Sequence, residues 1–200
     1  MYEKSGPRPG DGDEPRREPW RFPPDNELPA VAPIELFLVQ TPSIVGIVLA
    51  AEVYSTGCLI RLRFVMNRAD QDEHTWQELC GRAVYRPQPY PPIASAPAYP
   101  GLQVTATTAT GGTASTQQSV PLADRGRPGP PTGPLLALHN VRSSSDRSRA
   151  HVAADLWLWP LPPPGELTLS ATWASFELSS AQVVINASAI TEAATRVQQF

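Results

Sequence analysis

The stretch IVGIVLAAEVYSTGCLIRLRFVM, residues 44–66, decides the fold of this chain. Its first half is apolar and rich in β-branched side chains, as in a central strand that is covered on both faces or bulged at Gly46. Ser55-Thr56-Gly57 then supplies a tight turn. In the second half, apolar residues alternate with a set that includes Arg61 and Arg63, which is the period of a strand. The stretch therefore predicts a β-hairpin with both arginines on its outer face.

Short apolar or alternating runs, bounded by turn-forming residues, recur on both sides of this hairpin and are typical of strands rather than helices. They predict further strands over residues 34–39, 101–108, 115–120, 135–141, 151–159, 167–173 and 181–185. A charged stretch, 68–82, has loose helical spacing and predicts a short helix or an irregular excursion. Loops are predicted over the Pro-rich runs 86–100 and 121–134 and a hairpin tip over the polar run 142–149.

The end of the chain has a different period. Ile190, Ala193, Ala194 and Val197 recur at helical spacing, and an Asn or Ser just before them can cap the free amides. This pattern predicts one amphipathic helix over residues 187–199.

Together these elements predict an all-β domain: an antiparallel β-sandwich or partly open barrel of about eight strands with one C-terminal α-helix. Proline supplies 24 of the 200 residues, more than twice its usual share of about 5%, so long helices are not expected to dominate. Strands do not alternate with crossover helices, which excludes a doubly wound parallel sheet and the nucleotide chemistry that it often hosts.

The first 27 residues differ in composition from the rest. They carry seven acidic and five basic side chains and almost no aliphatic ones, so they cannot bury enough surface to offset the entropy of ordering. We expect a disordered tail over residues 1–27 and the folded domain over residues 28–200. Trp20 and Phe22, flanked by prolines, are the exceptions, and they either stay in the tail or dock on the domain or on a partner.

Charge and apolar runs restrict the partners and the compartment. The net charge of −3 leaves no basic field for nucleic-acid phosphates. The longest apolar run, 44–51, is far shorter than the roughly 20 residues that span a membrane, and the first 27 residues show no export signal. Cys58 and Cys80 lack the spacing of a metal or redox site. We therefore expect reduced thiols, with a disulfide between the two as the alternative, and a cytoplasmic location with no membrane contact.

Catalytic motifs are absent from the sequence. It contains no G-x-S-x-G, H-E-x-x-H or G-x-x-x-x-G-K segment. His74, His139 and His151 are widely separated, and His151 lies about 13 Å along its predicted strand from Asp155. The prediction is a protein that is not an enzyme and has no metal and no cofactor, with an unrecognised catalytic site near His151 and Asp155 as the alternative.

The aromatic side chains of the strand over residues 151–159 give the strongest binding signal. Trp157 and Trp159 share one face, and Arg61 and Arg63 line the outer face of another strand. If this face is exposed, it forms an apolar platform suited to a sugar ring, a peptide or a partner subunit. The alternative is a structural role, in which the tryptophans are core residues or are covered by the C-terminal helix or the Pro-rich loops.

These four residues are the candidate binding site. They predict a non-catalytic binding or protein-interaction module whose partner is another protein, contacted through the tryptophan face or through the Pro-rich loops. The enzyme is one alternative, and a structural subunit of a larger assembly is another.

Some segments also resemble a known family. They are Leu28-Pro29-Ala30, Tyr54-Ser55-Thr56-Gly57, the run 159–165 (WPLPPPG) and Trp173 ahead of Glu177. The chain is similar in these segments, over roughly residues 28–200, to a family of small β-rich actinobacterial proteins of uncharacterised function. It departs from that family at Cys58, where an aromatic residue is usual, and at residues 198–200, where Leu-Trp-Pro is common. The resemblance implies a domain type and no activity.

Overall fold

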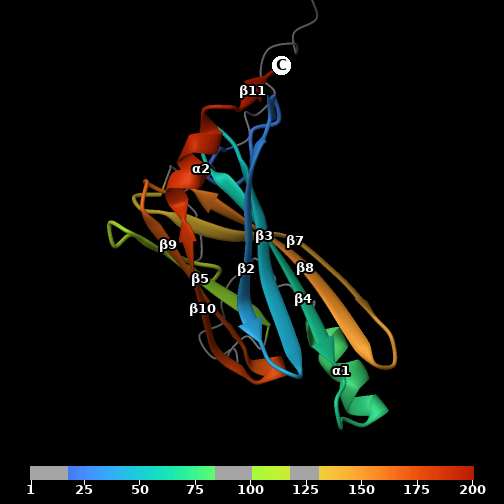
Figure 1. Cartoon of the computed structure of the whole chain (residues 1–200). Helices are drawn as coiled ribbons and strands as arrows, with labels where there is room; N and C mark the ends of the chain where they lie inside the picture. The colour runs from blue at the N-terminus through green and yellow to red at the C-terminus, as the bar shows by residue number, and fades with distance from the viewer. Residues whose placement is uncertain (1–17, 84–100, 118–130) are drawn as a thin grey trace, which may run out of the picture.

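The computed structural model describes residues 18–83, 101–117 and 131–200 (Figure 1). It is an antiparallel β-sandwich, as the sequence predicts. A five-stranded sheet has the order β2-β3-β4-β8-β7, a four-stranded sheet the order β10-β9-β5-β6, and β1 pairs with β11. The strands are β1 (Glu27–Leu28), β2 (Ala30–Gln40), β3 (Ile44–Val53), β4 (Cys58–Asn67), β5 (Leu102–Thr108), β6 (Thr113–Ser115), β7 (Leu135–Ser145), β8 (Arg149–Trp159), β9 (Glu166–Trp173), β10 (Leu178–Asn186) and β11 (Gln198–Gln199).

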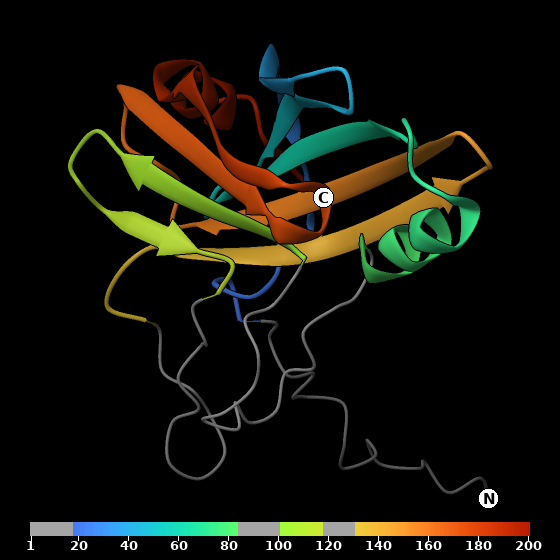
Figure 2. The same ribbon diagram turned by 90° about the horizontal axis from the view of Figure 1, so that it is seen from below.

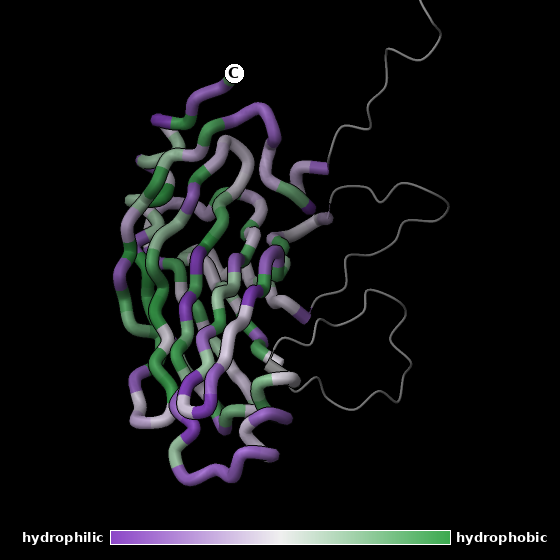
Figure 3. The backbone as a smooth tube through the Cα atoms, turned by 90° about the vertical axis from the view of Figure 1, so that its right-hand side faces the viewer, coloured by the Kyte–Doolittle hydropathy of each residue, from purple (hydrophilic) through white to green (hydrophobic). Residues whose placement is uncertain are grey.

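The predicted hairpin over residues 44–66 is confirmed as β3 and β4. Its alternation sets the two faces of the large sheet, which Figure 3 shows as alternating apolar and polar colours along the strands. The bulge lies at Leu49, where the register shifts between Val48 and Ala50, and not at Gly46. Glycine is needed at position 46 because of close packing: a Cβ there would lie 2.6 Å from ring atoms of Phe64.

The core lies between the two sheets. Phe64 of β4 meets Trp173 of β9 edge to face, with the ring centroids 5.2 Å apart, and both side chains are buried. The inner-face residues of β8, which include Leu156 and Leu158, are buried on the same side of the large sheet. The two sheets are therefore joined through large apolar side chains, as in other sandwiches.

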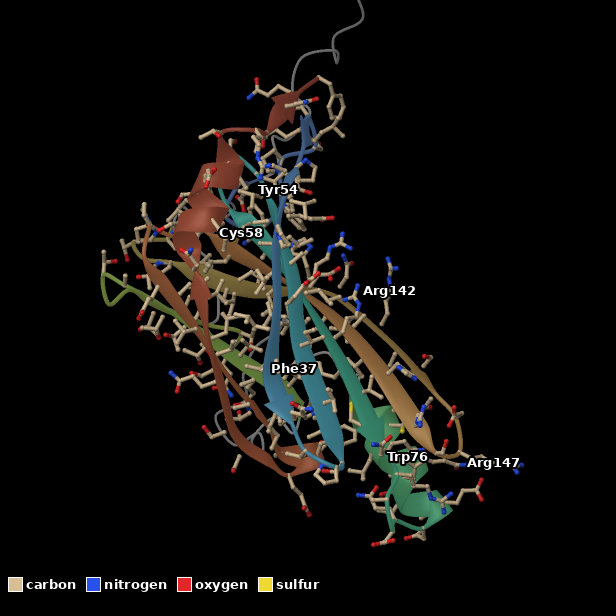
Figure 4. The ribbon with its side chains drawn as sticks, viewed as in Figure 1. Phe37, Tyr54, Cys58, Trp76, Arg142 and Arg147 are labelled. Carbon is tan, nitrogen blue, oxygen red and sulfur yellow. The ribbon has the colours of Figure 1, made fainter. Side chains whose placement is uncertain are left out.

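The helices lie at the ends of the sandwich. Figure 2 shows α1 (Glu73–Ala83) on one side of the molecule and the β5–β6 hairpin on the other. Trp76 of α1 is buried and donates its indole N–H to the carbonyl oxygen of Asp146, between β7 and β8, at 2.9 Å (Figure 4). A short 3-10 turn, η1 (Ala174–Phe176), joins β9 to β10. No helix among residues 18–83, 101–117 and 131–200 is long and apolar enough to cross a membrane.

The C-terminal helix is shorter than predicted. Asn186 caps α2 (Ala187–Ala194) through the amide of Ser188, and Ile190 and Ala193 are buried. The helix does not continue to residue 199, because the chain leaves it after Ala194 and pairs as β11 with β1. Pairing with a second segment replaces the remaining helical hydrogen bonds, which periodicity alone did not reveal.

The N-terminal tail is also shorter than predicted, within the part that the structure describes. Residues 1–17 lie outside the described residues, but residues 18–27 pack on the domain. Glu27 is buried, and its carboxylate accepts hydrogen bonds from the amide and the hydroxyl of Ser55. The partner groups that order this segment are far away in sequence, so its composition gave no sign of them.

Two further boundaries differ from the predictions. The partner strand of β5 is Thr113–Ser115 rather than 115–120, of which residues 118–120 lie outside the described residues. The polar run 142–149 is strand at both ends, and the turn is held by the Asp146 carboxylate, which accepts from the amides of Ser148 and Arg149. The predicted loop over 86–100 and most of the one over 121–134 lie outside the described residues; residues 131–134 are neither helix nor strand.

Candidate functional site

The tryptophans of β8 share one face, as the alternation predicts, and this is the outer face of the large sheet, away from the core, which the sequence left open. Trp157 is nevertheless fully buried. It pairs across the sheet with Leu59 of β4 and Ala137 of β7, while Trp159 pairs with Leu135. Leu59, Leu135 and Trp157 are buried but do not belong to the core cluster between the sheets. They form a second, smaller apolar cluster on the outside of the sandwich.

The chain's own N-terminal segment packs on this face of the sheet, against Trp157, Trp159 and His139. Residues 18–24, here named the cis segment, read EPWRFPP. The ring of Trp20 meets that of Trp159 edge to face, with centroids 6.3 Å apart. The ring of Phe22 meets that of His139 at 5.5 Å, nearly perpendicular. Such geometries are those that aromatic rings prefer. We name the receiving surface, Trp157, Trp159 and His139, the aromatic face.

Two hydrogen bonds join the cis segment to the aromatic face. Trp157 Nε1 donates to the carbonyl oxygen of Pro19 at 3.2 Å. His139 Nε2 lies 2.9 Å from the carbonyl oxygen of Arg21 and donates to it, since a carbonyl oxygen only accepts. Both contacts go to main-chain atoms of the cis segment. They hold its backbone without reading its side chains.

A β-bulge positions His139. The register of β7 against β8 shifts between Leu138 and Asn140, so His139 has no cross-strand partner. A bulged residue is turned away from the regular alternation, which re-aims its side chain. Here the imidazole reaches the cis segment. In the sequence, His139 is one of three widely separated histidines, and no sequence pattern predicted the bulge.

The turn between β3 and β4 supports the other side of the face. The ring of Tyr54, which is labelled in Figure 4, lies with its centroid 5.8 Å from that of Trp157 and at an interplanar angle of 75°. A Cβ on Gly57 would lie 2.8 Å from ring atoms of Trp157 and 2.6 Å from the carbonyl oxygen of Leu158. Only glycine lets the indole pack this closely against the turn. Burial, and then the charge of Glu52, raises the pKa of Tyr54, which keeps its hydroxyl neutral.

The predicted binding residues Arg61 and Arg63 lie beside the aromatic face, each paired with a carboxylate. Arg61 donates to Glu52, and the Arg63 guanidinium is 3.7 Å from Asp155. The hydrogen bond to Glu52 raises the pKa of Arg61. Together these four side chains alternate in charge across three strands. The arrangement balances the charge of the sheet face and leaves neither arginine as a free anion site.

The cis segment is folded into a turn by hydrogen bonds within it. The amides of Arg21 and Phe22 both donate to the carbonyl oxygen of Glu18, and the Arg21 guanidinium pairs with the Glu18 carboxylate at 2.9 Å. These bonds bring Trp20 and Phe22 to the aromatic face from one short turn. The sequence pointed to these two aromatics and left open whether they dock. Their receiving residues were not all predicted, because His139 depends on the bulge.

The catalytic alternative is not assembled in the described residues. His151 is exposed, and Asp155 contacts Arg63 and Asn140 instead of an imidazole. No group of three His, Cys, Asp or Glu side chains within the described ranges is placed to hold a metal ion. Cys58 and Cys80 are free, and burial raises the pKa of the Cys58 thiol to about 12.

No family model, curated protein or solved structure matches this chain. The resemblance to the actinobacterial family stays a prediction. What the site can do is therefore argued from its own contacts: apolar rings that receive aromatic side chains, and two N–H groups that receive backbone carbonyls.

Proposed function

We propose that this chain is a non-catalytic protein-interaction module that binds a short peptide segment of a partner protein on its aromatic face. One observation carries the proposal. A buried indole N–H on Trp157 and a bulged imidazole on His139 both donate to main-chain carbonyls of a docked segment. Every peptide offers such carbonyls, so these two donors suit peptide recognition in general.

The apolar part of the face supports the same function. Aromatic side chains are enriched at the centres of protein interfaces, where they combine a large contact area with a polar tip. Leu59, Leu135 and Trp157 form a buried cluster that a sandwich of this kind does not need for its core. A cluster on the outside of a sheet requires a cover. Here a peptide segment of the chain itself, the cis segment, packs against Trp157 of this cluster.

We also infer that the module works in the cytoplasm. Neither Cys58 nor Cys80 is in a disulfide, and free thiols are typical of reducing compartments. The charge ladder beside the aromatic face, Glu52-Arg61-Asp155-Arg63, supports a protein partner over a nucleic acid, because its cations are already paired with carboxylates.

The test is a selection of random peptides displayed on phage against the full chain. We expect enriched peptides whose binding is lost in Trp159→Ala and weakened in His139→Ala. Thr168→Ala is the matched control, since Thr168 lies on β9 of the other sheet. Circular dichroism and thermal unfolding check that each variant is folded. Enriched peptides that bind the Trp159→Ala variant as well as the wild type would reject this face as the site.

A further inference from the structure

We propose that the cis segment is an internal ligand of the aromatic face, and that the partner segment which replaces it has the same chemistry: two aromatic side chains separated by one residue and bordered by prolines. This inference rests on the proposed function. It adds the class of the ligand and a self-competition that regulates access to the site.

The cis segment contacts all three residues of the aromatic face. Trp20 contacts Trp159, and Phe22 contacts His139. The carbonyls of the residues just before these two aromatics, Pro19 and Arg21, accept from Trp157 and His139. The spacing of one residue between the aromatics thus matches the spacing of the two carbonyls. A partner segment needs this same spacing to make all four contacts.

The fit of the cis segment is incomplete, which leaves room for a better ligand. The indole N–H of Trp20 is buried and has no hydrogen-bond acceptor among the described residues. Phe22 remains 43% exposed. The ion pair between Arg21 and Glu18 lies within the segment and adds nothing to its hold on the sheet. A partner that supplies an acceptor for the indole, or covers the phenyl ring, binds more tightly than the cis segment does.

The segment can leave without opening the sandwich. None of its side chains belongs to the core cluster. It is followed by only two residues before β1, which is anchored by the hydrogen bonds of Glu27 to Ser55 and by pairing with β11. The tether after Pro24 is therefore short, and a short tether gives an effective concentration of millimolar order. Competition from such a tethered ligand weakens binding of a free one.

Release of the segment exposes to water the rings that it contacts, Trp157 and Trp159. Trp157 is 0% exposed with the segment in place. Because apolar surface is unfavourable in water, exchange for a partner segment is favoured over an empty face. The device is a competition between two ligands for one site, rather than a gate.

The experiment uses a fluorescently labelled peptide of the cis-segment sequence, EPWRFPP, titrated into the full chain by polarisation. Wild type is compared with the double variant Trp20→Ala/Phe22→Ala, whose own segment has lost both aromatic contacts. We expect the peptide to bind this variant at least about tenfold more tightly than the wild type. Phe37→Ala is the matched control, because Phe37 is an exposed aromatic on β2, at the opposite edge of the same sheet (Figure 4).

Each outcome of this experiment either supports or overturns a stated part of the proposal. Equal affinity for wild type and double variant overturns the self-competition. No binding to the folded double variant overturns the ligand class, while random peptides that still depend on Trp159 would leave the proposed function standing. Binding that survives an added Trp159→Ala change places the peptide elsewhere and overturns the inference. A peptide with both aromatics replaced by alanine must not bind. If the double variant fails to fold, Phe22→Ala alone, at a half-exposed position, gives the same comparison.

Discussion

Trp157 donates its indole N–H to the carbonyl oxygen of Pro19, a residue 138 positions earlier in the chain. The bond joins a fully buried side chain on the outside of the large sheet to the segment that covers it. Without it the indole N–H would be a buried donor with no acceptor, which costs about 1–3 kcal/mol. The covering segment and the aromatic face therefore stabilise each other.

Trp157→Phe tests this bond. The substitution keeps an aromatic ring and removes the donor, leaving the Pro19 carbonyl free to bind water at the edge of the segment. We expect the free energy of unfolding to fall by about 1–3 kcal/mol, from the lost hydrogen bond and the smaller ring. Urea denaturation measures it. An unchanged midpoint would show that neither the hydrogen bond nor the larger indole contributes to stability.

Gly57 and Gly81 form a matched pair of glycine substitutions. Gly57→Ala places a methyl group against the Trp157 ring and the Leu158 carbonyl, so we expect a loss of about 1–3 kcal/mol. Gly81 lies in α1, and an alanine Cβ there would meet no neighbouring atom within 4 Å, so Gly81→Ala is expected to gain about 0.5–1 kcal/mol from helix propensity. Thermal unfolding of both variants should give shifts of opposite sign.

Phe64 and Phe37 separate core packing from surface exposure. Phe64 is buried against Trp173, and Phe64→Ala is expected to cost about 3–5 kcal/mol through lost burial and a cavity. Phe37 is 54% exposed on β2, and Phe37→Ala should change stability by less than about 1 kcal/mol. Chemical denaturation of both variants compares the two losses in the free energy of unfolding. Similar losses in the two would contradict a core placed between the sheets at Phe64.

The Cys58 thiol predicts a loss of stability at alkaline pH. Its pKa is about 12 in the folded chain, against an ordinary value of 9.0. The folded state thus holds its proton where the unfolded thiol ionises, so stability is full below pH 9 and falls as the pH rises from 9 to 12. The slope is about 1.4 kcal/mol per pH unit at most.

Unfolding measured at about pH 7, 9 and 10.5 checks this dependence, with Cys58→Ala as the reference that removes this one group. The wild type should lose more stability than Cys58→Ala over that range. Parallel curves for the two proteins would contradict the pKa. Alkylation gives a second readout, since the half-buried Cys80 should react with iodoacetamide faster than Cys58 in the folded chain.

The sequence predicted the sandwich well where period and burial agree. The alternation over residues 58–66 placed Arg61 and Arg63 outward, and the alternation in β8 placed both tryptophans on one shared face without deciding which face is buried. Where a strand buries only one face, as over residues 60–66, a period of two carries enough information to assign the faces. The antiparallel order follows because no crossover helices separate the strands.

The candidate site was only half predictable. Trp157 and Trp159 were identified, but the residues that contact them, Pro19 and Trp20, belong to a stretch whose composition is typical of disorder. His139 entered the site through a bulge, which breaks the alternation that a sequence pattern can read. Likewise, the C-terminal helix ends at Ala194 because residues 198–199 find a partner strand at residues 27–28. Contacts between distant segments decide all three cases.

The pairing of β1 with β11 has a mechanical consequence. We name the pair of β1 and β11 the clasp. Phe200 donates its amide N–H to the carbonyl oxygen of Asn26, so the chain ends on the outer side of the clasp lie side by side. A pulling force applied at these two points would load the short ladder one rung at a time, as a zipper opens, before any tension reached the sandwich. The clasp would yield first and the cis segment would lose its anchor, while the two packed sheets stayed closed.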